Sequence, residues 1–333
     1  MRDTPKLAET TIRAAIHEHY GVAVAALSFL PLGLDSATAV YRVEAADGAA
    51  FFLKSRTMLA FSPASVAVAR YLHELGVPYI VAPLLSKSHS PWVAINDFAL
   101  TLYPFIDGRI GAEAGLSEQH WIALGQTLKQ IHTSQLPPEL TVIIRRETFV
   151  PSRRHIIDRL GDAVGGRSDP VGREFAEFWR SRREQIRTIV DRADTLGGKM
   201  RMASVPSVLC HADLHTFNVL LEETGQWWIV DWDETVLAPK ERDLMFFAGG
   251  IMRGLIQPHQ TEAFFRGYGS SAIDPGAIAY YRYARAVEDM SAYGERVFFL
   301  PEAGEETRRD ALAGFQQLFE PGNIVEIAFA ADR

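Results

Sequence analysis

One stretch constrains the rest of the chain most strongly, residues 208–234, which read VLCHADLHTFNVLLEETGQWWIVDWDE. An apolar run leads into Asp213 and Asn218, and a second apolar run ends at Asp231. Turn-forming residues at 222–225 predict a hairpin that joins the two apolar runs. Asp213 and Asn218 then lie in a loop between strands, and Asp231 lies at the end of a strand. We therefore expect these three side chains to converge.

Carboxylates and an amide in this order suit phosphoryl transfer to a hydroxyl group. Such a transfer needs a carboxylate beside the attacking oxygen and oxygen ligands that hold Mg²⁺ on the phosphates. Asp213 would orient the acceptor hydroxyl and take its proton, while Asn218 and Asp231 would hold the metal. The order and spacing match those of a kinase catalytic loop and its metal-binding strand.

Two other interpretations of the same stretch remain open. The first is a hairpin whose tip carries polar residues without a catalytic role. The second is an iron site of two histidines and one carboxylate built on His211 and Asp213. The iron site leaves Asn218 and Asp231 unexplained, so kinase-type chemistry is favoured.

Composition sets the class of protein. The chain has 333 residues, 47% of them hydrophobic and 23% charged, enough for two domains or one large lobed unit. Its net charge is −7 and it has no basic run, so we expect no nucleic-acid partner, whereas cationic small molecules would suit it. Its single cysteine, Cys210, excludes an internal disulfide and is expected to be a buried thiol. No signal peptide is apparent, and the longest apolar stretch, 22–34, is too short to cross a bilayer, so we expect a cytoplasmic protein that does not enter the membrane.

The first hundred residues predict a small mixed lobe. Periodicity indicates an amphipathic helix at 5–19 and a second helix from Ser62-Pro63 to Gly76. Strands are predicted at 26–30, 39–45, 50–54, 80–85 and 98–105, with a hairpin turn at Asp47-Gly48.

Three features of this lobe suggest a nucleotide site. Lys54 closes an apolar strand; by itself it reads as a solvated strand end, but beside the 208–231 stretch it becomes a candidate to bind the α- and β-phosphates. The loop 32–38, which contains Ser36, could cover the phosphates with backbone N–H groups, although its single glycine also fits a plain turn. Residues 103–108 read as a hinge or a simple loop, and a hinge would lie beside the purine.

Beyond the hinge the chain is mainly helical. Helices are predicted at 117–132, 172–196, 239–247, 259–267, 276–297 and 304–319. The glycine pairs at 165–166 and 197–198 read as loops. The predicted domains are an N-terminal nucleotide-binding lobe (1–102), a hinge (103–108) and a C-terminal helical lobe with the catalytic loop and acceptor site (109–333).

These motifs resemble the aminoglycoside phosphotransferases, and the segment 231–246 looks most like their spectinomycin phosphotransferase branch. The resemblance covers nearly the whole chain and is most specific at 208–247. It implies an α+β, two-lobed protein-kinase-like fold, with a small mixed N-terminal sheet, one main helix and a larger helical lobe. It also implies a kinase that uses ATP and Mg²⁺ to phosphorylate a hydroxyl of an antibiotic, most closely spectinomycin, and so confers resistance.

The resemblance also implies residue roles. Asp213 is then the catalytic base, and Asn218 and Asp231 are the metal ligands. Lys54 and Ser36 contact the phosphates. The remaining implied residues are Leu102, Tyr103 and Phe105 at the adenine, and His211 and Asp243 bracing the catalytic loop. Asp233 and Glu234 are candidates to bind a cationic acceptor, or they only flank the metal site.

One departure from the kinase pattern concerns Lys54. Kinase-like folds pair this lysine with a glutamate on the following helix, but here the helix has no carboxylate before Glu74, near its end. Another group then positions Lys54, or ATP binding is weak. A nucleotide-binding pseudokinase therefore stays open as an alternative. A kinase for a cellular amino alcohol such as choline or homoserine also stays open, because such kinases share the catalytic residues. The sequence does not predict the oligomeric state.

Overall fold

The computed structural model describes residues 7–32, 37–166, 169–300 and 303–331. Packing divides the chain into two compact units. The N-terminal unit comprises Arg2–Arg145 and His211–Val236, and the C-terminal unit comprises Arg146–Cys210 and Leu237–Arg333. A division by packing does not test the expected lobes and hinge, which stay predictions.

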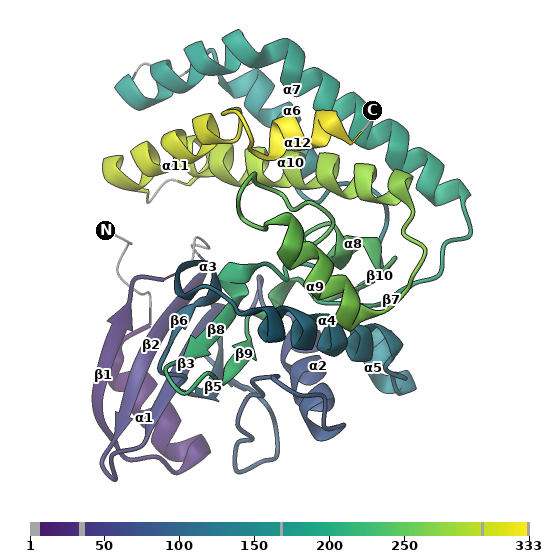
Figure 1. Cartoon of the computed structure of the whole chain (residues 1–333). Helices are drawn as coiled ribbons and strands as arrows, with labels where there is room; N and C mark the ends of the chain where they lie inside the picture. Colours follow the sequence, from purple (N-terminus) through teal and green to yellow (C-terminus); the bar gives the residue numbers. More distant parts are fainter. Residues whose placement is uncertain (1–6, 33–36, 167–168, 301–302, 332–333) are drawn as a thin grey trace. The chain divides into compact units, whose positions relative to one another are not determined.

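A five-stranded antiparallel sheet organises the N-terminal unit, with strand order β1-β2-β3-β5-β4 (Figure 1). Its strands are β1 (Val24–Leu30), β2 (Thr38–Ala45), β3 (Ala50–Thr57), β4 (Val93–Ile95) and β5 (Phe98–Pro104). The predicted turn at Asp47-Gly48 joins β2 to β3, and Gly48 has the positive φ, 88°, that favours glycine. This hairpin is confirmed.

Helix α1 (Glu9–Tyr20) contributes the main apolar partner of this sheet. Ile12 and Ile16 are fully buried in one cluster with Leu53 and Leu102. Because side chains alternate between the two faces of a strand, Lys54 points to the opposite face from Leu53. Because the apolar side of α1 covers the face of the sheet that carries Leu53, the opposite face is the one that carries Lys54.

The prediction of a strand at 80–85 is wrong. Only Ile80 forms a bridge, to Ile229, and Leu84 N–H donates instead to the carbonyl of Leu102 at 2.7 Å. Pro83 lies between them and has no N–H to donate, so the segment cannot form a regular ladder with either neighbour. The fifth strand of the sheet is the short β4, which the sequence pattern did not predict.

Helix α2 (Pro63–Glu74) follows its prediction closely. It starts with Pro63 after Ser62, and Gly76, just beyond its end, has a φ of 76°. The helix packs against the 3₁₀ turn η2 (Trp232–Glu234), which belongs to the stretch that most constrains the chain.

A second sheet of this unit carries the hairpin of residues 208–234. Its strands, in spatial order, are β6 (Gly108–Ile110), β8 (Val219–Glu222) and β9 (Trp227–Ile229). The turn at 222–225 is confirmed, but it joins β9 to β8, a strand that was not predicted. The apolar run β7 (Val208–Cys210) pairs instead with β10 (Val236–Ala238). Helices α3 (Gly111–Ala114), α4 (Glu118–Thr133) and α5 (Pro138–Ile143) complete the unit.

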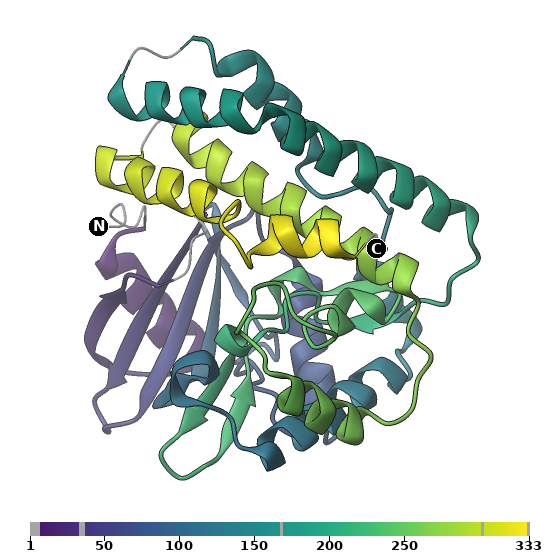
Figure 2. The same ribbon diagram turned by 45° about the horizontal axis from the view of Figure 1, so that its top comes forward.

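The C-terminal unit is built around α10, whose aromatic side chains Tyr280, Tyr281 and Tyr283 are almost completely buried. Helix α10 packs against α6, α7, α8, α11 and α12 (Figures 1 and 2). A helix that is apolar on several faces is expected at the centre of a bundle. The helices are α6 (Arg154–Ala163), α7 (Pro170–Met202), α8 (Glu241–Leu244), α9 (Pro258–Tyr268), α10 (Pro275–Phe298), α11 (Glu305–Gln317) and α12 (Ile324–Ala330).

Two predictions in this unit need correction. The helix expected at 239–247 is only the single turn α8. The glycine pair at 197–198 is not a loop but lies inside α7. A Cβ at Gly197 would lie 2.2 Å from the carbonyl oxygen of Phe149, so the glycine permits a close approach of the chain to the helix.

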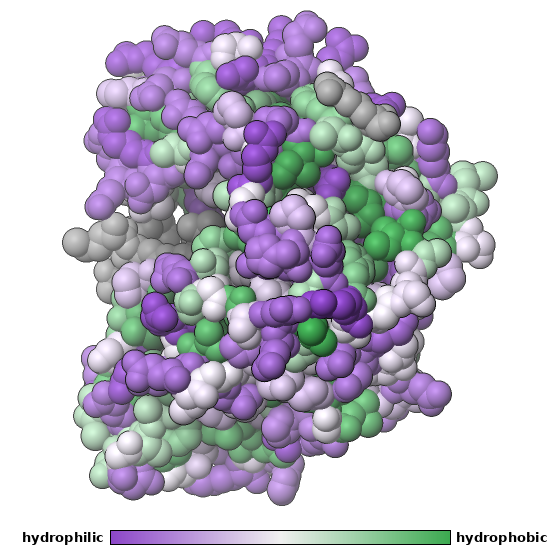
Figure 3. Space-filling model, viewed as in Figure 1, coloured by the Kyte–Doolittle hydropathy of each residue, from purple (hydrophilic) through white to green (hydrophobic). Residues whose placement is uncertain are grey.

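The outer side of α7 matches the predicted solvated face. Hydrophilic side chains cover much of this helix in the space-filling view (Figure 3), while Phe175 and Ile189 are fully buried. Among the described residues, no helix is both long and apolar enough to cross a membrane.

Candidate active site

The loop that follows β7 holds Asp213 in a tight, hydrogen-bonded turn. Ala212 adopts a left-handed φ of 69°, and Asn218 N–H donates to the carbonyl of His215 at 2.9 Å. Left-handed backbone is uncommon outside glycine and often marks functional loops. The result is a short loop whose polar side chains extend from a hydrogen-bonded backbone.

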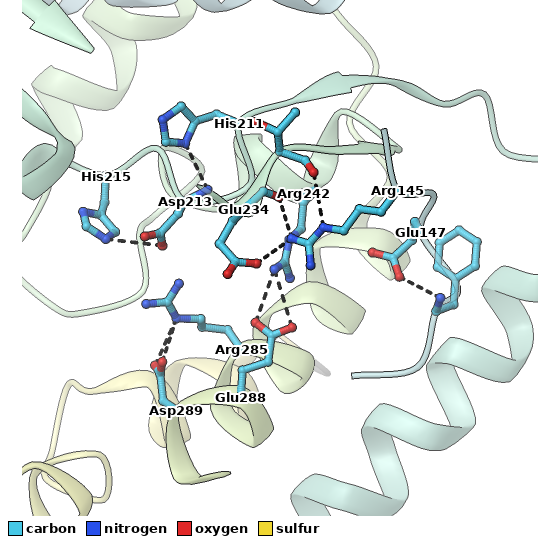
Figure 4. Close-up of polar contacts among 12 residues, drawn as sticks. Arg145, Glu147, His211, Asp213, His215, Glu234, Arg242, Arg285, Glu288 and Asp289 are labelled. Carbon is cyan, nitrogen blue, oxygen red and sulfur yellow. Dashed lines mark hydrogen bonds and ion pairs between the residues drawn. The ribbon is translucent and has the colours of Figure 1, made fainter. Parts of the chain in front are cut away.

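The Asp213 carboxylate is oriented by its loop neighbours (Figure 4). The amide nitrogen of Asn218 donates to Asp213 Oδ2 at 3.1 Å and to the Asp213 carbonyl at 2.8 Å. Figure 4 shows the contacts of Asp213 to His211 and His215. His215 Nε2 lies 3.4 Å from Oδ1. The side chain of Asp213 is 23% exposed, so the carboxylate is held in place but open to a ligand. This geometry suits a group that receives a proton from a bound hydroxyl.

His211 ties this loop to the strand that precedes Asp231. Its Nδ1 accepts from Asp213 N–H at 3.3 Å, which leaves Nε2 to donate to the carbonyl of Val230 at 3.1 Å. The side chain is fully buried, and its ring lies 4.6 Å from that of Trp232. Since both ring nitrogens face backbone groups, His211 is poorly suited to ligate iron.

A backbone hydrogen bond links Asn218 to the residue that precedes Asp231. Val230 N–H donates to the carbonyl of Asn218 at 3.0 Å, which fixes the loop beside the residue just before Asp231. The amide nitrogen of Asn218 faces Asp213, so its Oδ1 is directed elsewhere. Asp231 has a left-handed φ of 65°, and its side chain is 46% exposed. One neutral and one charged oxygen donor form a fitting partial ligand set for Mg²⁺, whose remaining ligands are usually water and phosphate oxygens.

Lys54 lies at the centre of an ionic cluster with two carboxylates. Its Nζ is 2.9 Å from Asp231 Oδ1 and 2.6 Å from Asp233 Oδ2. Arg56 Nη1 lies 2.5 Å from the same Asp233 oxygen. The strand lysine is therefore adjacent to the predicted metal ligand, although 177 residues separate them in the sequence.

Burial and charge act against each other in this cluster. Burial acts to lower the pKa of Lys54, but the charges of Asp231 and Asp233 outweigh it and raise the pKa above its ordinary value. Burial acts to raise the pKa of Asp231, but the ion pair with Lys54 prevails and lowers it. Burial raises the pKa of Asp233, against the opposing pull of Lys54. Lys54 is therefore cationic at neutral pH, which the predicted role of binding phosphates requires.

The predicted adenine residues lie on or just after β5. Leu102 is fully buried in the cluster with α1, and its carbonyl already accepts from Leu84 N–H. Tyr103 is on the face of Lys54; burial raises its phenol pKa, against the charge of Lys54. Phe105 lies under the guanidinium of Arg42, 4.5 Å from the ring centre. Ser36 is outside the described residues.

The two acceptor candidates have different surroundings. Asp233 faces Lys54 and Arg56, as described. Glu234 Oε2 lies 2.5 Å from Arg145 Nη2, and the same nitrogen donates to the Glu234 carbonyl at 2.6 Å (Figure 4). Both side chains of this second pair are nearly half exposed. Glu234 therefore carries a counterion that a cationic acceptor would have to displace.

Asp243 lies in the C-terminal unit on α8 and is fully buried. Its neighbours there include Cys210, whose thiol pKa is raised by burial and by the charge of Asp243. The predicted buried cysteine is confirmed. The bracing role of Asp243 stays a prediction.

In the same unit, Arg242 of α8 pairs with Glu288 of α10 (Figure 4).

Three residues near the site were not predicted from the sequence: Arg56, Arg145 and His215. The first could have been recognised, because Lys54 and Arg56 are two residues apart on a strand and so share a face. His215 lies inside the predicted catalytic loop. Arg145 gave no signal, because it lies far from Glu234 in the sequence.

A loop carboxylate paired with an asparagine, a second aspartate after a strand, and a strand lysine beside that aspartate define a kinase-type phosphotransferase site. Residues 28–282 match the phosphotransferase enzyme family (APH). Since this match covers most of the chain, the protein belongs to that family.

Known proteins agree with this assignment. The chain is similar to spectinomycin phosphotransferase APH(9)-Ia in complex with ADP and spectinomycin, with 29% identity, a TM-score of 0.86 and coverage of 98% of this chain and 99% of that one. The AMP-bound complex of the same enzyme gives 28% identity and a TM-score of 0.81, over 97% and 99% of the two chains. Protein StrN of Streptomyces griseus is 24% identical over 223 residues, 65% of this chain and 67% of StrN. The predicted kinase-like fold and the predicted enzyme class, an ATP-dependent phosphotransferase, are confirmed.

Proposed function

We propose that the protein transfers the γ-phosphoryl group of ATP to a hydroxyl of a cationic aminocyclitol, with spectinomycin as the first candidate. The observation that carries the proposal is two side-chain pairs, Asp213 with Asn218 and Lys54 with Asp231. The backbone bond from Val230 N–H to the Asn218 carbonyl joins the segments that carry them. The similarity to a spectinomycin phosphotransferase over 98% of the chain supports the acceptor class.

The chain's own residues would act as follows. Asp213 accepts the proton of the acceptor hydroxyl as that oxygen forms its bond to the γ-phosphorus, and the bond between this phosphorus and the β–γ bridging oxygen breaks to release ADP. Asn218 and Asp231 would hold Mg²⁺, which neutralises charge on the phosphates. Lys54 would bind the α- and β-phosphates. His211 keeps the Asp213 backbone in register with Val230, so the carboxylate stays aimed at the acceptor.

The first test is a coupled ADP-release assay with magnesium-ATP and a panel of acceptors: spectinomycin, streptomycin, kanamycin, choline and homoserine. We expect strong turnover with spectinomycin. Turnover with choline or homoserine alone would replace the antibiotic with a cellular amino alcohol and keep the chemistry. Silence with every acceptor, together with measurable ATP binding, would favour a pseudokinase.

A variant of Asp213 separates chemistry from binding. Asp213→Asn keeps the shape of the side chain but removes the proton acceptor, so kcat should fall by about 10²–10⁴-fold. Binding of magnesium-ADP, measured by calorimetry, should change little. Turnover retained in this variant would refute the assignment of Asp213 as the base.

A further inference from the structure

The ionic cluster around Lys54 contains a carboxylate that could replace the glutamate which kinase-like folds carry on the following helix. Helix α2 has no carboxylate before Glu74, yet Lys54 Nζ has a carboxylate oxygen at 2.6 Å, that of Asp233. Asp233 lies in the 3₁₀ turn η2, and η2 packs against α2. A carboxylate thus reaches Lys54 from a turn beside the helix that lacks one.

We propose that Asp233, braced by Arg56, is the residue that positions Lys54 for the nucleotide phosphates, in place of a glutamate on α2. This inference rests on the proposed function, since it assigns Lys54 to the nucleotide. It makes Asp233 a positioning residue rather than an acceptor-binding one.

Asp233 is the better anchor of the two carboxylates that contact Lys54. Its side chain is 23% exposed, whereas that of Asp231 is 46% exposed. Asp231 also follows the strand beside Asn218 and is the proposed metal ligand. Once Asp231 binds a metal ion, Asp233 is the carboxylate that remains to hold Lys54.

Arg56 fixes Asp233 from the other side. Lys54 and Arg56 are alternate residues of β3, so their side chains leave the same face of the sheet about 7 Å apart. Both are only 16% exposed, and two poorly solvated cations at this separation repel each other. Asp233 Oδ2 contacts both cations, and its attraction to each offsets their repulsion and favours one arrangement of the two side chains.

The turn that carries Asp233 is itself held locally. Thr235 Oγ1 donates to the carbonyl of Trp232 at 2.6 Å, and Thr235 N–H donates to the same oxygen at 3.1 Å. Trp232 is 5% exposed, and its ring lies against that of His211. Asp233 is therefore positioned by the same segment that supports the loop of Asp213.

The first test measures the reactivity of the Lys54 amine in the absence of nucleotide. Acetylation of Lys54 by a limiting amount of acetic anhydride, followed by peptide mass spectrometry, reports how strongly its amine is held. We expect Asp233→Asn to raise the rate several-fold and Asp233→Glu to restore most of the protection. Asp158→Asn, which removes an Asp–Arg pair on α6, serves as the matched control. An unchanged Lys54 rate in Asp233→Asn would overturn the proposal, whatever the enzyme's acceptor proves to be.

The second test is a double-mutant cycle on binding of magnesium-ADP by calorimetry. Loss of one charge-assisted contact predicts that Asp233→Asn weakens binding by about tenfold. In a Lys54→Met background the same change should have no further effect, because Asp233 acts through Lys54. An equal loss in both backgrounds would show that Asp233 acts on the metal or nucleotide directly. A raised KM for the acceptor with unchanged nucleotide binding would return Asp233 to the acceptor site.

These measurements distinguish the two proposals. If turnover is absent with every acceptor while both Asp233 tests succeed, the proposed acceptor class is wrong and the positioning role stands. If turnover is strong while Lys54 acetylation does not respond to Asp233, the function stands and the positioning role is refuted.

Discussion

His211 should couple stability to catalysis, since it is the side chain that joins the catalytic loop to the strand before Asp231. Both ring nitrogens bond to backbone groups, at 3.3 Å and 3.1 Å, and the side chain is fully buried. His211→Ala leaves the Asp213 N–H and the Val230 carbonyl without these partners. A buried group left unsatisfied costs about 1–3 kcal/mol, so the two together predict a loss of about 2–6 kcal/mol.

Two milder substitutions divide this effect. The amide of His211→Asn lies near the Nδ1 position and can keep the contact to Asp213, whereas the amide of His211→Gln lies near Nε2 and can keep the contact to Val230. Each should retain part of the stability. Turnover should follow the contact to Asp213, so the asparagine variant should have the higher kcat.

Thermal unfolding and steady-state kinetics on the same preparations measure both effects. The alanine variant should unfold at a temperature about 4 °C lower or more, given about 2 °C per kcal/mol for a chain of this size. His215→Ala is the comparison, because it removes a contact to the Asp213 carboxylate without breaking the backbone link. If His211→Ala keeps wild-type stability and kcat, the bracing argument fails.

Three further outcomes follow from the surroundings of single side chains. Removing Arg145 frees the Glu234 carboxylate from its ion pair, so Arg145→Ala should lower the KM of a cationic acceptor. The KM of ATP and the melting temperature should change little. An unchanged acceptor KM would exclude Glu234 from the acceptor site. Gly197→Ala should destabilise the C-terminal unit in denaturant unfolding, because a Cβ there meets the Phe149 carbonyl at 2.2 Å, and a stability equal to wild type would contradict this packing. Burial raises the pKa of Tyr41 to about 12, so the unfolded chain loses this proton at a lower pH than the folded chain does. The free energy of unfolding should therefore fall as pH rises from about 10 towards 12, which ultraviolet titration of tyrosinate and unfolding curves can follow. Ionisation of every tyrosine near pH 10 in the folded protein would refute this prediction.

The predictable part of the site is the part that is local in sequence. Asp213 and Asn218 are five residues apart in one loop, so their spacing alone brought them together. The pairing of Lys54 with Asp233 spans 179 residues, and no local pattern specifies it. The fold shows the same limit: the periodic helix α10 was placed to within a residue or two, whereas the three-residue strand β4 and the irregular segment 80–85 depended on their neighbours.

Lys54 and a metal ion would compete for the carboxylate of Asp231, and this competition can be tested. The proposed metal ligand is already paired with Lys54 at 2.9 Å, and a carboxylate that holds an ammonium group is a weaker metal ligand. Nucleotide phosphates would attract Lys54 and release Asp231, so metal and nucleotide should bind cooperatively.

Mn²⁺, followed by electron paramagnetic resonance, can report this coupling. Without nucleotide, Lys54→Met should bind Mn²⁺ about 1.4- to fivefold more tightly than wild type, because a partly exposed ion pair is worth about 0.2–1 kcal/mol. Lys54→Arg keeps the charge and should resemble wild type. With ADP present the order should reverse, since the methionine variant cannot hold the phosphates beside the metal. Equal Mn²⁺ affinities for wild type and Lys54→Met in the absence of nucleotide would show that Lys54 does not compete for Asp231, and the cooperative scheme would then lose its physical basis.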